Sequence, residues 1–195
     1  MSALILLARH GHHREVGHVL SGRSDIPLDT QGADEARRLA GRLADVPLRA
    51  VYSSPRRRAC ETAAPIAARH GLDVTIVDAL DEIDFGAWSG QRFDALDWDP
   101  AWRYWNAARG SARCPGGEGM AEAVTRARDH IEAIAQPDTP VLCVSHCDII
   151  RGLVAHYLGL SADRLFRFDV DPGSVTTLSL HPGGGRVVAL NERLS

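Results

Sequence analysis

The chain has 195 residues, which suits one domain with a sizeable core, and its 45% hydrophobic and 24% charged residues are ordinary for a soluble globular protein. Its formal net charge of -3 gives no basic field, so neither nucleic acid nor an anionic membrane is expected as a partner. The 4 cysteines are too few for a disulfide scaffold, and no apolar run reaches the roughly 18 residues of a membrane span. We therefore expect a single cytoplasmic domain over residues 1–195.

Short apolar runs alternate with helical patterns along the chain. The predicted strands cover residues 3–8, 50–52, 74–77, 141–144, 175–180 and 186–190, the last two joined by a turn at 181–185. The predicted helices cover residues 33–43, after a cap at Asp29 or Thr30, 55–69, with Ser54 as N-cap and Pro55 as first residue, 118–135 and 148–158. Strands that alternate with helices predict an α/β fold whose sheet is mostly parallel and covered by helices on both faces.

Residues 91–119 break this alternation, because no clear helical or strand period runs through them. A stretch of this length without a period is typical of a functional cover or of a disordered segment. Its aromatic residues argue against disorder. Among them are Trp98, Trp102, Tyr104 and Trp105, which stand close in the sequence to Arg103, Arg109 and Arg113. We expect a cover segment here, with about half of these aromatics in the core, the commoner place for tryptophan at helical spacing.

Histidines follow two of the predicted strands. Arg9, His10 and Gly11 come directly after the first strand, and His146 follows the strand at 141–144. Ligands of open α/β sheets bind beyond the carboxyl ends of the strands, so both histidines are expected at one edge of the sheet. Gly11 would allow a sharp turn and a close approach of its N–H to a ligand. A plain surface loop at His10 and a helix-capping histidine at His146 are the alternatives.

Three consecutive arginines lie where the second predicted helix begins. Cations at the amino end of a helix oppose its dipole, at a cost of about 0.3–1 kcal/mol each if nothing compensates. We expect two of the three to pair with nearby carboxylates and one to face an anion at the sheet edge. The three are Arg56, Arg57 and Arg58.

Two carboxyl groups stand among apolar and small residues in the stretch LDEIDFGAWSG, namely Glu82 and Asp84. A carboxyl near a bound dianion holds its proton to higher pH, which is what a general acid requires. The alternative is a surface loop with ordinary acids. Two histidines, at least two arginines and one carboxyl form a set suited to phosphoryl transfer, and this set requires no metal or cofactor.

The sequence resembles the histidine phosphatase superfamily, the phosphoglycerate mutase-like group. The resemblance runs in order from about residue 4 to 180 and rests on six motifs, which match Arg9 to Gly11, Asp25 to Gly32, Ser54 to Ala63, Leu80 to Gly90, Pro115 to Glu118 and Val144 to His146. It implies a three-layer sandwich around a mostly parallel sheet. It also selects Arg58 among the three arginines and Glu82 over Asp84.

The resemblance implies a role for each matched residue. His10 would attack phosphorus and become a phosphohistidine. Arg9, Arg58 and His146 would hold the phosphoryl oxygens. Glu82 would protonate the leaving alcohol and then activate water, and loss of such an acid typically costs about 10²–10⁴ in rate.

The chain departs from the family pattern around the phosphate site. The serine or threonine and the asparagine that often follow the first histidine are absent from RHGHHREV, so His13 would serve as a substitute donor. Ser21 and Gly22 would supply the contacts that the family makes at a Q-G or S-G pair. Cys147 stands where the family often has glycine, which would keep a backbone N–H contact and place a side chain in the pocket wall.

A metal site and a reactive thiol are two further interpretations of the histidines and cysteines. Three histidines, His12, His13 and His18, could suggest a metal with Cys143 and Cys147, but the thiol spacing does not give the usual knuckle, and no metal is expected. Cys147 is either a reactive thiol with a lowered pKa or inert packing, and packing is favoured.

The substrate and the oligomeric state are less constrained. Only about thirty residues separate Glu82 from the stretch that begins at Pro115, which argues for the small phosphatase branch over the longer mutases. We expect a small phosphorylated metabolite as the substrate. The cover segment would select it through the residues Trp98, Trp102, Trp105, Arg103, Arg109 and Arg113, with Trp102 and Arg103 as the pair to test. Tryptophans of this set that are not in the core could stack on a flat group such as the base of a ribazole phosphate. A mutase, an α-ribazole phosphate phosphatase, a phosphoprotein phosphatase and a non-catalytic phospho-ligand sensor are the alternatives. A homodimer is left open.

Overall fold

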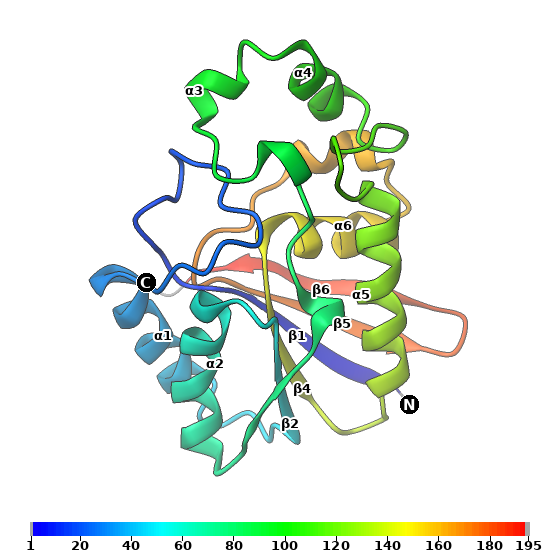
Figure 1. Cartoon of the computed structure of the whole chain (residues 1–195). Helices are drawn as coiled ribbons and strands as arrows, with labels where there is room; N and C mark the ends of the chain where they lie inside the picture. Colours follow the sequence, from blue (N-terminus) through cyan, green and yellow to red (C-terminus); the bar gives the residue numbers. More distant parts are fainter. Residues whose placement is uncertain (1, 194–195) are drawn as a thin grey trace.

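The computed structural model describes residues 2–193 and has a six-stranded sheet in the order β3-β2-β4-β1-β5-β6 (Figure 1). The strands are β1 (Ala3–Arg9), β2 (Ala50–Ser53), β3 (Val74–Ile76), β4 (Val141–Ser145), β5 (Val175–His181) and β6 (Gly184–Glu192). The first four are parallel to one another, β5 is antiparallel to β1, and β6 is antiparallel to β5. The predicted α/β class and mostly parallel sheet are confirmed.

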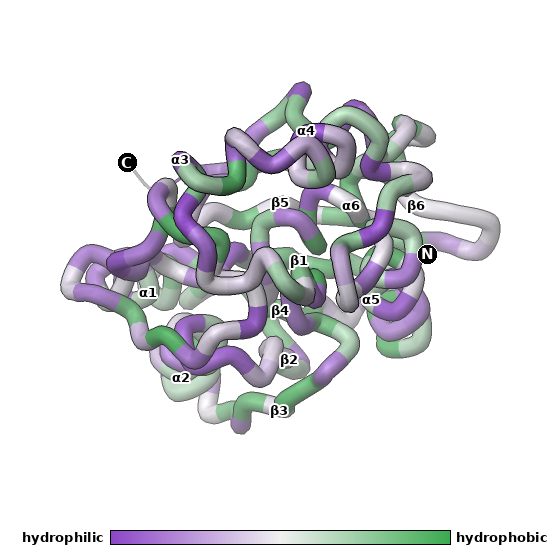
Figure 2. The backbone as a smooth tube through the Cα atoms, turned by 45° about the horizontal axis from the view of Figure 1, so that its top comes forward, coloured by the Kyte–Doolittle hydropathy of each residue, from purple (hydrophilic) through white to green (hydrophobic). Residues whose placement is uncertain are grey.

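Helices cover both faces of the sheet, which makes three layers. The helices are α1 (Thr30–Arg42), α2 (Arg57–His70), α3 (Phe93–Leu96), α4 (Pro100–Ala107), α5 (Met120–Ile134) and α6 (Cys147–Tyr157), with short 3-10 helices η1 (Asp78–Leu80), η2 (Gly86–Trp88) and η3 (Ala162–Arg167). Figure 2 shows α1 and α2 on one side of β1 and β4, and α5 on the other. Within residues 2–193, no helix combines the length and apolar character needed to cross a membrane.

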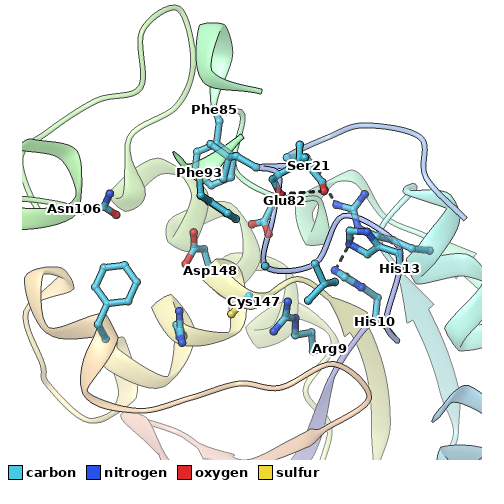
Figure 3. Close-up of a pocket in the computed structure, with 18 of the residues that line it drawn as sticks. Arg9, His10, His13, Ser21, Glu82, Phe85, Phe93, Asn106, Cys147 and Asp148 are labelled. Atoms are coloured by element: carbon cyan, nitrogen blue, oxygen red, sulfur yellow. Dashed lines mark hydrogen bonds between the residues drawn. The ribbon is translucent and has the colours of Figure 1, made fainter. Parts of the chain in front are cut away.

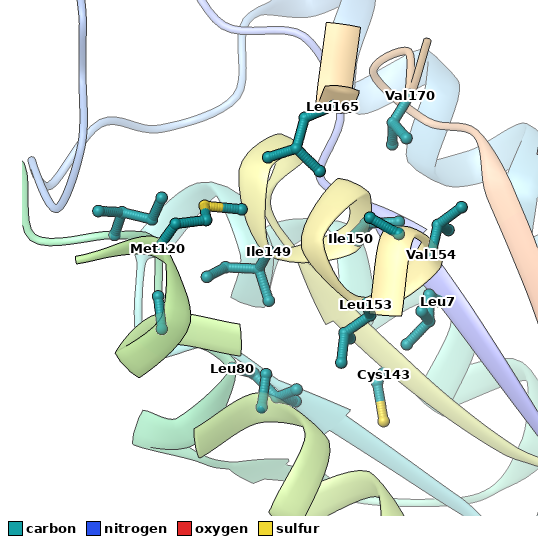
Figure 4. Close-up of a cluster of buried hydrophobic side chains, with 14 of the residues drawn as sticks. Leu7, Leu80, Met120, Cys143, Ile149, Ile150, Leu153, Val154, Leu165 and Val170 are labelled. Carbon is teal, nitrogen blue, oxygen red and sulfur yellow. The ribbon is translucent and has the colours of Figure 1, made fainter. Parts of the chain in front are cut away.

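Alternation along the central strands explains these layers. Leu6 and Ala8 of β1 pack with residues of α1 and α2, such as Leu39 and Ile66. Ile5 and Leu7 point to the opposite face and join the cluster under α5 and α6. Figure 4 shows Ile149, Leu153 and Cys143 within that second cluster. Because both faces of β1 are buried, this strand is apolar throughout until it reaches Arg9.

Two helix boundaries differ from the prediction because of side-chain contacts. Helix α1 begins at Thr30 rather than Ala33, and the Asp29 carboxylate caps it by accepting from the Gly32 N–H. Helix α2 begins at Arg57 and has Arg56 as its N-cap, so the predicted cap at Ser54 is wrong. The Ser54 hydroxyl instead donates to Asp81 and accepts from the Arg56 N–H.

The cover segment is more regular than its sequence predicts. It contains α3 and α4, which lie together at the end of the molecule away from α1 and α2 (Figure 1). Asp99 caps α4 by accepting from the Ala101 N–H, and Pro100 occupies the first turn. An aspartate followed by proline is a helix-start signal that does not depend on hydrophobic periodicity. Trp102 and Trp105 are buried in the core, whereas Trp98 is 82% exposed.

Candidate active site

The two histidines meet where the central strands end. Strands β1 and β4 are parallel neighbours with Arg9 opposite Ser145, so His10 and His146 follow at the same edge. Their rings lie 5.1 Å apart between centroids, and both are buried. The backbone N–H of His10 donates to the backbone carbonyl of Ser145 at 3.1 Å, which ties the two strand ends together.

Arg58 connects the two histidines from α2. Its Nε donates to His10 Nε2 at 3.2 Å, and its Nη2 contacts His146 Nδ1 at 3.1 Å. The same guanidinium donates to the carbonyls of Gly22 and Ser24, and its residue is only 1% exposed. As predicted, one arginine of the three faces the site, and the other two pair with carboxylates, Arg56 with Asp81 and Arg57 with Glu61.

These contacts determine which ring nitrogen of each histidine carries the proton. His10 Nδ1 lies 2.9 Å from the Gly11 carbonyl, which requires a proton there and leaves the Nε2 lone pair toward Arg58. His146 Nδ1 accepts from Arg58, so its Nε2 carries the proton and donates to the Ser54 hydroxyl at 2.7 Å. Burial first, and then Arg58, lower the pKa of both histidines well below the ordinary 6.5. Both imidazoles are therefore neutral at pH 7.

His13 is the third ring of this group. Its centroid lies 5.3 Å from that of His10. Burial, followed by the charges of Arg58 and Arg9, lowers the pKa of His13 to about 4. Its Nδ1 accepts weakly from the Glu15 N–H at 3.4 Å, which leaves Nε2 as the N–H donor.

Glu82 follows η1 and lines the cavity beside these rings (Figure 3). Burial first, and then the nearby Asp148, raise the pKa of Glu82 to about 7. Arg23 and Arg126 each donate to the Glu82 carbonyl, at 2.9 and 3.0 Å, and each pairs with Glu118. The glutamate of the stretch Pro115 to Glu118 thus holds the two arginines that fix Glu82.

Asp84, the other carboxyl considered, turns away from the cavity. Its side chain is 41% exposed and accepts from the Gly86 N–H, and it is not a lining residue. Of the two carboxyl groups, Glu82 is therefore the one that lines the cavity, and its role as general acid stays a prediction.

The cavity itself has a volume of about 230 Å³. One end is basic, with Arg9, His10, His13 and Arg58, and the other is lined by the cover segment, α6 and η3. Its further lining residues are Val16, Gly17, Val19, Leu20, Ser21, Gly22, Glu82, Phe85, Phe93, Trp102, Asn106, Arg109, Cys147, Asp148, Arg151 and Phe166. The site therefore joins an anion-binding end to a partly aromatic one.

Most predicted site residues line this cavity, but Gly11, Arg103 and His146 do not. The Gly11 N–H donates to the Thr62 hydroxyl, and a β-carbon at Gly11 would lie 2.6 Å from the Gly32 carbonyl oxygen. Glycine is needed there for packing against α1 rather than for approach to a ligand. Arg103 is exposed on α4 and is absent from the lining, since the residue one position earlier, Trp102, takes the inward face. His146 lies behind Arg58 and is fully buried.

The cysteines and the remaining histidines show no metal arrangement. Among the residues that the structure describes, no group of three or more His, Cys, Asp or Glu side chains is placed to hold an ion. His12 pairs with Asp29 at 2.6 Å, and Cys143 is buried in the core. Burial raises the pKa of Cys147 to about 11, so the alternative of a low-pKa thiol is wrong.

On the far wall of the cavity, Arg109 was named from the sequence as part of the cover segment, but its partner Asp148 was missed. Arg109 pairs with Asp148 at 3.0 Å between Nη1 and Oδ2, and both line the site with Phe166 and Arg151. Asp148 is the second residue of α6 and lies two positions after the predicted site residue His146. This closeness to His146 was the one sequence feature that could have marked Asp148 as a site residue. The partners lie 39 positions apart, so no local pattern joins them.

Comparison with known proteins supports the family that the motifs suggest. Residues 5–193 match the histidine phosphatase superfamily (branch 1). The bifunctional protein Rv2228c of Mycobacterium tuberculosis is 34% identical over 192 residues, which are 95% of this chain and 52% of that protein. The chain thus spans about half the length of this relative.

Two further proteins are similar over nearly their whole length. Phosphoserine phosphatase 1 of Hydrogenobacter thermophilus is 28% identical over 193 residues, 96% of this chain and 91% of the relative. The mycobacterial glucosyl-3-phosphoglycerate phosphatase Rv2419c superposes with a TM-score of 0.88 at 27% identity, covering 98% of this chain and 99% of that one. Motifs, fold and site agree, and the chain belongs to the histidine phosphatase superfamily.

Proposed function

We propose that this chain is a metal-independent phosphomonoesterase that hydrolyses a small phosphorylated metabolite through a phosphohistidine intermediate. The observation that carries the proposal is the lone pair of His10 Nε2, which points toward the Arg58 guanidinium while the Nδ1 proton is held by the Gly11 carbonyl. A neutral imidazole beside a fixed cation is a nucleophile placed where a phosphoryl dianion binds. The relatives named as phosphatases of phosphoserine and of glucosyl-3-phosphoglycerate support the same reaction class.

The reaction proceeds in two displacements. His10 Nε2 attacks phosphorus, the bond to the leaving oxygen breaks, and Glu82 gives its proton to that oxygen. Glu82, now a carboxylate, takes a proton from water as the water oxygen attacks phosphorus, and the P–N bond breaks to release phosphate. Arg9 and Arg58 hold the phosphoryl oxygens, and His146 keeps Arg58 in place. A direct phosphoryl contact from His146 stays a prediction.

The substrate class follows from the two ends of the cavity. The basic end suits a phosphoryl group, and its donor besides the arginines is His13 Nε2. The neighbouring Ser21 donates its hydroxyl proton to the Glu15 carboxylate at 2.9 Å. The rest of the substrate faces Trp102, Cys147 and the aromatic end, which the cover segment partly forms. A volume of about 230 Å³ suits a small metabolite better than a folded phosphoprotein.

The test is phosphate release from 4-nitrophenyl phosphate and from a panel of metabolite monophosphates, with EDTA present. Wild type should turn over, and His10→Ala should not. Wild type quenched in alkaline denaturant should carry label from a ³²P substrate on His10, and acid treatment should release that label. Transfer that requires a bisphosphate primer would replace hydrolysis by a mutase reaction. Inactivity of both proteins, with phosphorylated ligands still raising the melting temperature, would replace it by a phospho-ligand sensor.

A further inference from the structure

The far wall of the cavity contains a buried ion pair that the proposed reaction does not use. Asp148 lies in the first turn of α6, and its Oδ2 is 3.0 Å from Nη1 of Arg109. Arg109 comes from the cover segment, donates to the Asn106 side chain at 3.0 Å, and has its guanidinium 5.2 Å from the Trp105 ring centroid. Arg109 is 3% exposed, so this contact is set in the fold rather than on a mobile surface.

The ion pair stands beside Glu82. Figure 3 shows the Glu82 and Asp148 side chains extending into the same cavity, one from the loop after η1 and the other from α6. They are the two carboxyl residues among its lining side chains. A negative charge at Asp148 favours the protonated form of a neighbouring carboxyl, and the cation at Arg109 partly offsets that effect.

We propose that Asp148 is a positioning residue that keeps the proton on Glu82, and that Arg109 of the cover segment limits this effect. The inference rests on the proposed function, in which Glu82 delivers that proton to the leaving group. It makes the cover segment a determinant of the pH range of the chemistry, in addition to any contact it makes with substrate.

Other charges that face Glu82 act against Asp148. The ionisable side chains around the cavity come from β1 and its following loop, α2, the cover segment and α6, and they are Arg9, His10, His13, Arg58, Arg109, Cys147, Asp148 and Arg151. Arg58 and Arg9 lower the pKa of Glu82, whereas burial and Asp148 raise it, with a result of about 7. Asp148 is therefore the side-chain charge whose removal should free the Glu82 proton.

The two members of the pair predict shifts of opposite sign. Asp148→Asn removes the negative charge, so Glu82 ionises more readily, and the basic limb of kcat/KM should move down by about 1 pH unit. Arg109→Gln leaves Asp148 without its counter-charge, so the same limb should move up. The double variant lacks both charges and should follow Asp148→Asn.

The experiment measures kcat/KM against pH for phenyl phosphate, whose poor leaving group requires the acid. In parallel, ¹³C NMR of glutamate-labelled protein follows the Glu82 carboxyl, assigned by its loss in Glu82→Gln. Arg113→Gln is the control, because Arg113 belongs to the same cover segment but is exposed and pairs with Glu122. This variant should leave both curves unchanged. The double variant also guards against misfolding caused by an unpaired buried Asp148.

Opposite shifts of the Glu82 titration in the two single variants support the proposal. Unchanged titration, or shifts of the same sign, would overturn it and leave the pair as a structural tie between the cover segment and α6. The NMR reading is independent of turnover. If Glu82→Gln retains the wild-type rate and pH profile, the proposed role of Glu82 fails, while the NMR shifts still decide whether Asp148 controls its proton.

Discussion

Gly32 on α1 should be intolerant of even one added methyl group. A β-carbon at Gly32 would overlap the His12 carbonyl oxygen and lie 2.8 Å from the His12 nitrogen. Carbon atoms in good contact are about 3.5–4.0 Å from their neighbours, so the His12 backbone would have to move. Those backbone atoms belong to the loop that follows His10, and Gly11 in turn packs against the Gly32 carbonyl.

The magnitude follows from this overlap. Overpacking typically costs about 1–3 kcal/mol. The clash at Gly32 is with backbone atoms of His12, which cannot rotate away as a side chain could, so Gly32→Ala should lie near the upper end of that range. For a chain of this size, 1 kcal/mol corresponds to about 2–4 °C in Tm, so the variant should melt about 6–12 °C lower. Because the shifted loop directly follows His10, the proposed nucleophile, kcat/KM should fall as well.

Gly41 on the same helix provides the matched control. No atom lies within 4 Å of a β-carbon built there, and alanine is the better helix former by up to about 1 kcal/mol. Gly41→Ala should therefore keep its activity and melt up to about 2–4 °C higher. Thermal unfolding monitored by circular dichroism measures both variants. A Gly32→Ala protein as stable as wild type, or an equal loss in Gly41→Ala, would refute the packing argument.

Three further predictions concern the site. Arg58→Lys replaces a guanidinium that contacts both histidines by a single ammonium group. The value of kcat/KM on 4-nitrophenyl phosphate should therefore fall by about 10²–10³. A loss below tenfold would contradict the proposal that Arg58 holds the phosphoryl oxygens. In the proposed reaction His10 must be neutral to attack, and its pKa lies well below 6.5. Once corrected for substrate ionisation, kcat/KM should therefore stay constant as the pH falls through 6.5. A decrease in kcat/KM with a pKa of 6.5 would contradict this prediction. With its pKa near 11, Cys147 should be about one-thousandth thiolate at pH 8, so peptide mapping should find slow alkylation by iodoacetamide.

The chemistry-bearing residues were predictable because their signals are local. A strand pattern identifies where β1 and β4 end, and parallel strands bring residues at those ends together whatever the rest of the fold does. His10 and His146 were found in this way. The choice of Arg58 and Glu82 among adjacent candidates required the resemblance, since periodicity does not separate Arg58 from Arg56 and Arg57.

The wall of the cavity was not predictable because it depends on which side chain another segment meets. Trp102 turns inward and its neighbour Arg103 outward, a result fixed by the start of α4 rather than by residue type. Ser54 had the sequence of an N-cap, but its hydroxyl takes part in the His146 and Asp81 network instead. Cys147 stands four positions before Arg151 in α6, yet burial, rather than this nearby cation, determines the direction in which its pKa shifts.

The position of β1 in the sheet has a consequence for how the chain folds during synthesis. Residues 3–9 leave the ribosome long before their partners in the sheet, which are β4, at residues 141–145, and β5, at residues 175–181. An apolar strand buried on both faces must therefore stay unpaired while well over a hundred residues are made, a state prone to aggregation. His10, the proposed nucleophile, cannot take its place beside Ser145 until β4 has been made, so we expect a chain truncated before β4 to require chaperones and to be inactive.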